Sequence, residues 1–323
     1  MDKVVVTRQV PDEFIKQLET IAQVEVWNEA FTPMPREQFL NAIKDATACF
    51  ITLTETIDEE AINAAPHLKV IANMAVGYDN IDVQLANDHK IVVTNTPDVL
   101  TETTAELGLS LMLSVARRIV EAERYVQDGQ WQSWSPYLLA GKDLYRSKVG
   151  IFGMGDIGKA FAKRLKGFEA NIMYHNRSRN EEAEEALGAL GALYVSFDTL
   201  LKHSDFIICT APLTAETENK FDSEAFAKMK NDAIFINIGR GAVVDESALV
   251  SALENNQILA CGLDVLREEP IQMDHPLLGM KNAVVVPHIG SASVVTRNKM
   301  IQLCVDNIKL VLNGNTAKTA VKA

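Results

Sequence analysis

Short apolar runs alternate with amphipathic stretches along the first hundred residues. The apolar runs favour β-strands and cover Val4–Thr7, Val24–Trp27, Cys49–Leu53, Val70–Ala75 and Ile91–Thr94. The stretches between them mix polar and apolar residues at helical spacing, at Asp12–Ala22, Arg36–Lys44 and Asp58–Ala64. This alternation predicts a parallel β-sheet with helices on both faces.

The same alternation begins again at Lys148. The expected strands are Val149–Phe152, Asn171–Tyr174, Leu193–Val195, Phe206–Thr210, Ala233–Ile238, Cys261–Val265 and Ala283–Val286. Their near-continuous apolar character is typical of strands that are buried on both faces. We therefore predict an α/β protein with two doubly wound parallel-sheet domains of the Rossmann or flavodoxin-like kind. The length of 323 residues allows two separate cores.

Two further helices are predicted outside these series. One long helix is expected from Thr101 to Gln127, followed by a loop that carries Trp131 and Trp134. Its apolar residues either pack into their own domain or form the face of a two-fold homodimer; they are Leu107, Leu111, Val115 and Ile119. A last helix covers Val294–Leu312, and the tail beyond Asn313 is expected to be mobile.

Composition and charge narrow the class of protein. Hydrophobic residues make up 47% of the chain and charged residues 23%, as in ordinary globular proteins. We expect no membrane segment, because no apolar run is long enough to span a bilayer, and the start of the chain does not resemble a signal peptide. The net charge of −12 argues against nucleic-acid binding. Four widely spaced cysteines are expected to be free thiols in a reducing cytoplasm, with no metal-ligand pattern.

The run Gly153-Met154-Gly155-Asp156-Ile157-Gly158 lies between an expected strand and an expected helix. That context predicts a dinucleotide-binding turn, whereas the motif alone also occurs at generic helix entries. Gly153 would make the tight turn, Gly155 would let backbone amides approach a pyrophosphate, and Gly158 would let helix and strand pack closely. Asp156 and Ile157 lead into the helix N-terminus, which favours an anion.

The end of the next strand indicates which nicotinamide cofactor is used. An acidic residue there would bind the ribose hydroxyls of NAD, but the chain reads Asn176-Arg177-Ser178-Arg179. Two guanidinium groups and a hydroxyl suit a 2′-phosphate. We predict a preference for NADP, with NAD also possible; the alternative is a solvated basic loop.

Three polar positions follow strands farther along the chain. Arg240 lies between two glycines, which suggest a close approach of the backbone to a ligand. His288 follows a strand end, where open α/β sheets bind ligands, although a packing role is also possible. A carboxylate from Glu268 or Glu269 could charge and orient this imidazole to make a proton donor, and alone either would be read as a solvated loop residue.

Together these motifs resemble the D-isomer-specific 2-hydroxyacid dehydrogenase family, and most closely its glyoxylate/hydroxypyruvate reductase and 2-ketogluconate reductase branch. The resemblance covers essentially the whole chain. It implies a discontinuous substrate domain, residues 1–99 and 288–323, with a dinucleotide-binding domain, residues 100–287, inserted between its parts. It also implies an active site in the cleft between the two domains.

The resemblance assigns roles to individual residues. Arg240 would bind the substrate carboxylate and keto oxygen, His288 would donate the proton, and Glu269 would orient the imidazolium. The backbone amides of Val76 and Gly77 would hold the carboxylate. Further positions would line the cofactor site, namely Pro212, Thr217, Ile238, Gly239, Asp264 and Gly290. Tyr137 and Leu138 do not reproduce an aromatic residue that the branch has in the loop after the long helix.

The expected activity is NAD(P)H-dependent reduction of a small 2-keto acid, such as glyoxylate, hydroxypyruvate or 2-ketogluconate, to the D-2-hydroxy acid. One alternative is a dinucleotide-sensing, corepressor-like binding protein of the same fold, and another is a D-lactate-type dehydrogenase. A protein with a vestigial site would be expected to lack Arg240, Glu269 or His288, and all three residues are present.

Overall fold

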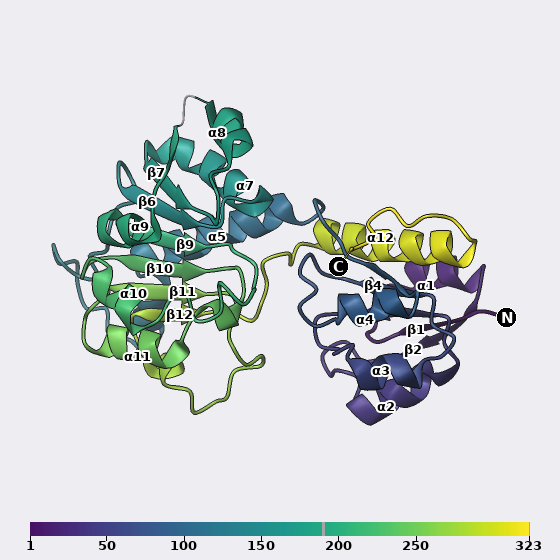
Figure 1. The fold of residues 1–323 in the computed structure, drawn as a ribbon. Coiled ribbons are helices and arrows are strands. Elements are labelled where there is room, and N and C mark those ends of the chain that lie inside the picture. Colours follow the sequence, from purple (N-terminus) through teal and green to yellow (C-terminus); the bar gives the residue numbers. More distant parts are fainter. Residues whose placement is uncertain (189–190, 323) are drawn as a thin grey trace. The chain divides into compact units, whose positions relative to one another are not determined.

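The computed structural model describes residues 1–188 and 191–322 and divides the chain into two compact units (Figure 1). Unit 1 comprises Met1–Leu100 and Ser293–Ala323, and unit 2 comprises Thr101–Ala292. Each unit contains one parallel sheet covered by helices on both faces. The α/β prediction with two parallel-sheet domains is therefore confirmed.

Unit 1 is built on a five-stranded sheet in the order β2-β1-β3-β4-β5. The strands are β1 Lys3–Val6, β2 Gln23–Val26, β3 Ala48–Ile51, β4 Val70–Asn73 and β5 Val92–Thr94. The helices are α1 Asp12–Glu19, α2 Arg36–Ala42, α3 Glu59–Ala64, α4 Val83–Asp88 and α12 Val294–Leu312, with a 3₁₀ turn at Ile43–Asp45. Helices α1 and α12 cover one face of the sheet and α2, α3 and α4 the other (Figure 1).

Alternate residues of β1 explain how this sheet supports two cores. Val4 and Val6 pack with Phe14 and Ile308 under α1 and α12, whereas Val5 belongs to the core on the opposite face. Successive side chains of a strand point to opposite faces, so a strand that is apolar throughout must be covered on both. The sequence pattern predicted this arrangement correctly.

The tail after α12 is attached to β5. Val321 N donates to Val93 O at 2.8 Å, and Thr94 forms an antiparallel bridge with Ala320. Asn307, in α12, donates from Nδ2 to the Thr319 hydroxyl. The expectation of a mobile tail was wrong for these residues, because the exposed edge of β5 offers backbone groups that the tail pairs with.

Unit 2 is built on a seven-stranded sheet in the order β12-β11-β10-β9-β6-β7-β8. The strands are β6 Lys148–Phe152, β7 Asn171–His175, β8 Ala192–Tyr194, β9 Phe206–Cys209, β10 Ile234–Asn237, β11 Ala260–Leu263 and β12 Ala283–Val285. The order reverses direction at β6 and β9, so the segments after these two strands diverge to opposite sides. In doubly wound sheets such a switch point is where ligands bind.

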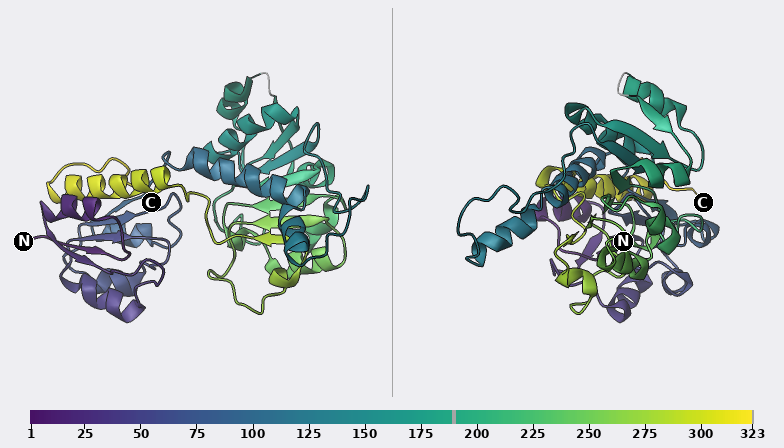
Figure 2. Two further views of the ribbon diagram at one scale, coloured as in Figure 1. Left: turned by 180° about the vertical axis from the view of Figure 1, so that it is seen from behind. Right: turned by 90° about the vertical axis from the view of Figure 1, so that its left-hand side faces the viewer.

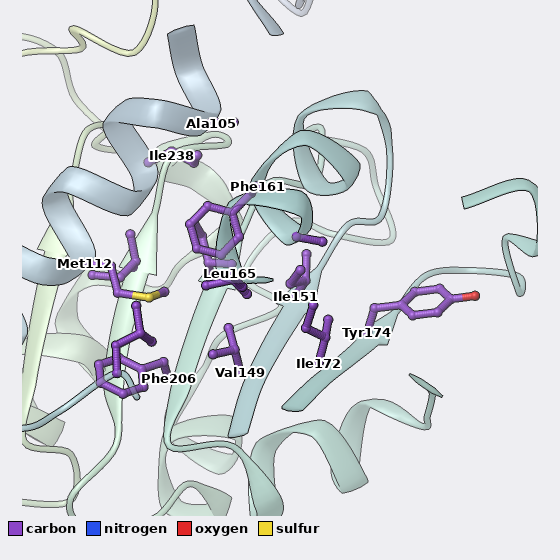
Figure 3. Close-up of a cluster of buried hydrophobic side chains, with 14 of the residues drawn as sticks. Ala105, Met112, Val149, Ile151, Phe161, Leu165, Ile172, Tyr174, Phe206 and Ile238 are labelled. Carbon is purple, nitrogen blue, oxygen red and sulfur yellow. The ribbon is translucent and has the colours of Figure 1, made fainter. Parts of the chain in front are cut away.

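Helices cover both faces of this sheet. They are α5 Thr101–Ala116, α6 Ile119–Gln127, α7 Asp156–Arg164, α8 Glu181–Leu187, α9 Phe197–His203, α10 Ser223–Lys228 and α11 Glu246–Glu254, with 3₁₀ turns at Leu165–Phe168, Gly241–Val243 and Pro276–Gly279. Figure 3 shows Met112 of α5 and Phe161 of α7 packing over Val149 and Phe206 of the sheet. The core on the other face is formed with α9, α10 and α11.

The helix expected from Thr101 to Gln127 is broken into α5 and α6. Arg118 adopts a left-handed conformation with φ 54°, which an α-helix cannot contain. The carbonyl of Ala116 accepts a hydrogen bond from Lys142 N, so it is taken by the returning loop. A Cβ on Gly141 would lie 2.1 Å from this same carbonyl oxygen, which explains the glycine. The prediction of one continuous helix was wrong because this contact is nonlocal.

Within the described ranges, no helix is both long and apolar enough to cross a membrane.

Candidate active site

The first element of the candidate site is the turn between β6 and α7. Gly153 has φ +103°, and a Cβ there would lie 2.6 Å from Ala211 N, so only glycine fits. A Cβ on Gly158 would lie 2.2 Å from Gly153 O. These two glycines let the first turn of α7 pack directly on the loop and on the segment after β9.

Gly155 differs from its two neighbours in the motif. A Cβ there would meet nothing within 4 Å, and the residue is the N-cap of α7. The open side of the loop is therefore free for a ligand at a helix N-terminus, where unpaired N–H groups and the helix dipole favour an anion. Met154 is fully buried, so it supports the loop from within the protein. This geometry fits the pyrophosphate of a dinucleotide.

Three side chains from the segments that follow β7 and β9 hold the loop in place. Met154 N donates to Asn176 Oδ1 at 2.6 Å, and Asn180 Nδ2 donates to Met154 O at 2.8 Å. Thr210 Oγ1 donates to Gly153 O at 2.5 Å. Asn176 is one of the residues expected at a 2′-phosphate, and its amide oxygen also braces the glycine loop. The roles of Asn180 and Thr210 were missed, although Asn180 stands before three glutamates as a helix N-cap would.

The basic loop after β7 contains two arginines in different situations. Arg179 makes a bidentate ion pair with Glu184, from Nε and Nη2 to both carboxylate oxygens, with a shortest distance of 2.7 Å. Arg177 is 84% exposed and lies 3.9 Å from Glu216. Ser178 is exposed beside them. The hydrogen bond from Arg179, and a second one from Tyr174, lower the pKa of the Glu184 carboxyl to about 2.

His288 and Glu269 form the polar pair at the carboxyl end of the sheet. Glu269 Oε2 lies 2.7 Å from His288 Nδ1, and Glu269 Oε1 accepts from Leu266 N at 2.9 Å. Burial opposes ionisation of Glu269, but the hydrogen bond and charge of His288, the Leu266 N–H and the charge of Arg240 together lower its pKa. The imidazole Nε2 has no protein partner among the described residues, so it is available to a substrate.

Asp264 shapes the turn that carries His288. Its buried carboxylate accepts from Ile289 N at 2.6 Å and from Gly290 N at 2.8 Å, while His288 N donates to its backbone carbonyl. His288 itself has φ 50°. Burial raises the pKa of the Asp264 carboxyl, against the opposing effects of these N–H groups and of His288. Asp264 and Gly290 thus present the histidine, and a Cβ on Gly290 would lie 3.0 Å from Asp264 Oδ2.

Arg240 follows β10, and the two glycines beside it lie close to other backbone segments of the protein. A Cβ on Gly239 would lie 2.6 Å from Ala211 O, and one on Gly241 would lie 1.8 Å from the carbonyl carbon of Leu266. Contacts with protein backbone therefore suffice to explain both glycines, and the approach of a ligand to this segment stays a prediction. The contact at Leu266 joins the Arg240 segment to the segment that carries Glu269.

Further bonds brace these two segments. Asn237 Nδ2 donates to Arg240 O, and Asn237 Oδ1 accepts from Gly239 N. Arg267 N donates to Glu246 Oε1 at 2.5 Å, and the same glutamate lies 3.4 Å from His275 Nε2. The sequence carries no local signal for the brace formed by Glu246, because its partners are more than twenty residues away.

The remaining expected positions are accounted for by their surroundings. Thr217 Oγ1 donates to the carbonyl of Pro212 at 2.7 Å and accepts from Thr214 N, so it orders the exposed loop after β9. Ile238 is buried against α5. Val76 and Gly77 lie in unit 1, in the loop that follows β4. No group of three metal-ligating side chains is found in the described parts of the chain.

Comparison with known proteins places this arrangement in a family. Residues 109–290 match the family model for the NAD-binding domain of D-isomer specific 2-hydroxyacid dehydrogenases. The chain belongs to this family. It is 43% identical over 323 residues to a glyoxylate reductase of Thermococcus kodakarensis, covering 99% of this chain and 96% of the relative. The suspected family, and its glyoxylate reductase branch, are confirmed.

Solved structures of similar proteins share the whole fold. A protein of Thermus thermophilus matches with a TM-score of 0.92 at 40% identity, covering 99% of this chain and 100% of that one. An NADPH-dependent glyoxylate/hydroxypyruvate reductase of Sinorhizobium meliloti, solved with NADP and malonate, matches with a TM-score of 0.84 at 33% identity, covering 99% and 96%. The chain therefore resembles, over nearly its full length, a reductase that was solved with NADP.

Proposed function

We propose that this protein is a glyoxylate reductase-like enzyme that reduces a small 2-keto acid to the D-2-hydroxy acid. The observation that carries the proposal is the His288–Glu269 pair, with its 2.7 Å contact, beside the Arg240 segment in the domain that holds the glycine loop. A charged imidazole with a free Nε2 is a proton donor, and a guanidinium suits a carboxylate and a developing oxyanion.

The site residues have separate roles in this reaction. A reduced nicotinamide dinucleotide held on the loop Gly153–Gly158 would supply the hydride that the carbonyl carbon needs. His288 gives a proton from Nε2 to the carbonyl oxygen, and the carboxylate of Glu269 stabilises the imidazolium before that transfer. Arg240 orients the keto acid and stabilises charge on its oxygen, and we propose that the amides of Val76 and Gly77 hold the substrate carboxylate.

We propose NADP as the preferred cofactor, bound on the glycine loop. Three features support this preference: β7 ends in His175, no carboxylate occurs at 176–179, and Arg177 is largely exposed. Arg179 shares its Nε and Nη2 groups with Glu184, which leaves Nη1 for a 2′-phosphate, and Asn176 has only its Nδ2 group to offer. Arg177 and Ser178 therefore carry most of the expected preference.

The testing experiment is a set of kcat/KM values for glyoxylate, hydroxypyruvate, pyruvate and 2-ketogluconate with NADPH and with NADH. We expect turnover of one of the first two with NADPH. Pyruvate as the best substrate would identify a D-lactate-type enzyme instead. Tight cofactor binding without turnover of any keto acid would favour a dinucleotide-sensing protein and overturn the enzymatic proposal.

We also propose a homodimer, formed through α6 and the loop after it. Leu111 and Val115 of α5 are buried in their own domain, so they are not free for a partner. In contrast, α6 has no buried residue, and the following loop exposes Trp134 (79%) and Tyr137 (87%). This segment stands out from the body of unit 2 (Figure 2). Exposed aromatic side chains on an anchored arm are suited to contact a second copy.

The proposed location is the cytoplasm. Cys49, Cys209, Cys261 and Cys304 are all buried free thiols, and a reducing compartment preserves such thiols.

A further inference from the structure

The loop after β4 has three consecutive backbone carbonyls held by hydrogen bonds. Ala75 O accepts from Thr96 N at 2.8 Å, and Val76 O accepts from Asn95 Nδ2 at 2.9 Å. Gly77 O accepts from Asn73 Nδ2 at 3.0 Å. The donors come from the ends of the neighbouring strands β4 and β5, so all three carbonyls face the sheet of unit 1.

A planar trans peptide fixes the direction of the N–H that follows each carbonyl. The C=O of one residue and the N–H of the next point to opposite sides of the peptide bond. Because the carbonyls of Ala75 and Val76 face the protein, the N–H groups of Val76 and Gly77 face away from it. Neither N–H has an acceptor within the described chain. Successive outward N–H groups form a concave site for an anion.

We infer that Asn73 and Asn95 are positioning residues of the substrate carboxylate site: their side-chain amides hold the peptide groups whose N–H atoms bind the anion. This inference rests on the proposed function, in which Val76 and Gly77 hold the keto-acid carboxylate. Neither asparagine touches the substrate. Their effect on the reaction comes entirely through the orientation of the loop.

Asn95 is itself held from behind by the C-terminal tail. Thr319 Oγ1 donates to Asn95 O at 2.7 Å, and Asn95 N donates to Thr319 O at 3.3 Å. Asn307 Nδ2 donates to the same hydroxyl at 2.8 Å. A chain of hydrogen bonds thus runs from α12 through Thr319 and Asn95 to the carbonyl of Val76.

Two buried polar atoms next to the loop lack hydrogen bonds. Asn73 and Thr96 are fully buried, and Asn73 Oδ1 and Thr96 Oγ1 have no hydrogen-bond partner in the described structure. Buried polar atoms without partners are unfavourable, so native proteins keep few of them. Asn73 therefore contributes to this loop through its Nδ2 group, which donates to Gly77 O.

The test is Asn95→Ala in the full chain, with Asn282→Ala as the matched control. Asn282 Nδ2 also donates to a backbone carbonyl, that of Leu259 at 3.2 Å, but it lies in unit 2. We expect the KM for the keto acid to rise about tenfold in Asn95→Ala, with kcat within about twofold, since the carboxylate is bound alike in ground and transition states. The Kd for NADPH should not change. A merely structural role would instead lower the melting temperature while leaving that KM unchanged.

A second pair of variants tests the brace. Thr319→Val should raise the same KM by a smaller factor, about threefold, whereas Thr316→Val, at an exposed position on the same tail, should leave it unchanged.

Calorimetry with oxalate in the presence of NADP measures binding at the carboxylate site without turnover. A wild-type protein that binds oxalate but reduces no keto acid would contradict only the proposed function. Equal keto-acid KM and oxalate Kd in wild type and Asn95→Ala would overturn the positioning role, and so would a wild-type protein that binds neither ligand.

Discussion

His288 Nδ1 lies 2.7 Å from Glu269 Oε2, and this contact determines which imidazole nitrogen is left for chemistry. The second carboxylate oxygen of Glu269 accepts from Leu266 N, so the glutamate is fixed at both ends. Arg240 contributes to the lowered pKa of this carboxyl, which keeps it ionised beside the imidazole. Glu269 therefore holds Nδ1 of His288, and Nε2 is the nitrogen presented to a substrate.

Replacing the orienting carboxylate should change the pH dependence of the reaction. Reduction needs a charged imidazole and oxidation needs a neutral one, so the two rates should change in opposite directions as the pH rises. Glu269→Gln removes the charge that stabilises the imidazolium, and the fall of keto-acid reduction should move to lower pH. The measurement is kcat/KM against pH in both directions.

The adjacent glutamate supplies the control for this experiment. Glu268 is exposed and bonded to Gln272, so Glu268→Gln should leave both pH profiles unchanged.

His288→Ala should lower kcat at least about a hundredfold, the scale of general acid catalysis, with the Kd for NADPH nearly unchanged. Near-normal turnover by His288→Ala would mean that another group donates the proton.

Two alanine substitutions in the glycine loop should separate folding from cofactor binding. A Cβ on Gly158 would overlap Gly153 O, so Gly158→Ala should destabilise unit 2 by about 1–3 kcal/mol, the usual cost of overpacking. A Cβ on Gly155 meets no protein atom within 4 Å, so Gly155→Ala should melt like the wild type. It should still raise the Kd for NADPH about tenfold or more, because it fills the space that a pyrophosphate needs. Unchanged NADPH binding by Gly155→Ala would place the dinucleotide elsewhere.

The Glu184–Arg179 pair should contribute to stability only above strongly acidic pH. The pKa of Glu184 is lowered from 4.5 to about 2, so its stabilising effect is complete above the unfolded value and is lost as the pH falls towards about 2. Urea unfolding should find Glu184→Gln less stable than wild type at neutral pH, with the gap closing across this acid range. Glu185→Gln changes the net charge equally at an exposed position and should show no such gap.

The same substitution has an expected effect on cofactor choice. Glu184→Gln weakens the hold on Arg179, so the NADPH/NADH ratio of kcat/KM should rise, whereas Arg177→Ala should lower it. Glu185→Gln again serves as the control. If neither Glu184→Gln nor Arg177→Ala changes the ratio, the assignment of the 2′-phosphate to this loop is contradicted.

The loop after α6, with its exposed Trp134 and Tyr137, predicts the assembly state. Sedimentation equilibrium at micromolar concentration should give a dimer for the wild type, and Trp134→Ser together with Tyr137→Ser should shift it towards monomer. The melting temperature measured at high dilution should fall little in this variant, since neither side chain is buried in its own domain. A monomeric wild type would refute the proposed interface.

The local sequence pattern was enough to predict the parallel strands, the glycine loop and the candidate site residues. Strands buried on both faces read as apolar runs, and a glycine motif between strand and helix marks a phosphate-binding turn in one short segment, so β6, α7 and the loop that joins them could be predicted. Arg240 and His288 could likewise be singled out because they follow strands, and a parallel sheet brings successive strand ends to one edge. The choice of Glu269 over Glu268 came from the resemblance to the family.

Contacts between distant segments were decided only by the tertiary structure. Lys142 takes the carbonyl of Ala116 and ends α5, and the contact with Leu266 suffices to explain Gly241. Glu184 pairs with the guanidinium of Arg179. The sequence of the basic loop by itself had predicted that this guanidinium binds a phosphate. The hydrogen bonds of a side chain depend on which residues folding places within about 3 Å of it, and no periodicity in the sequence records those neighbours.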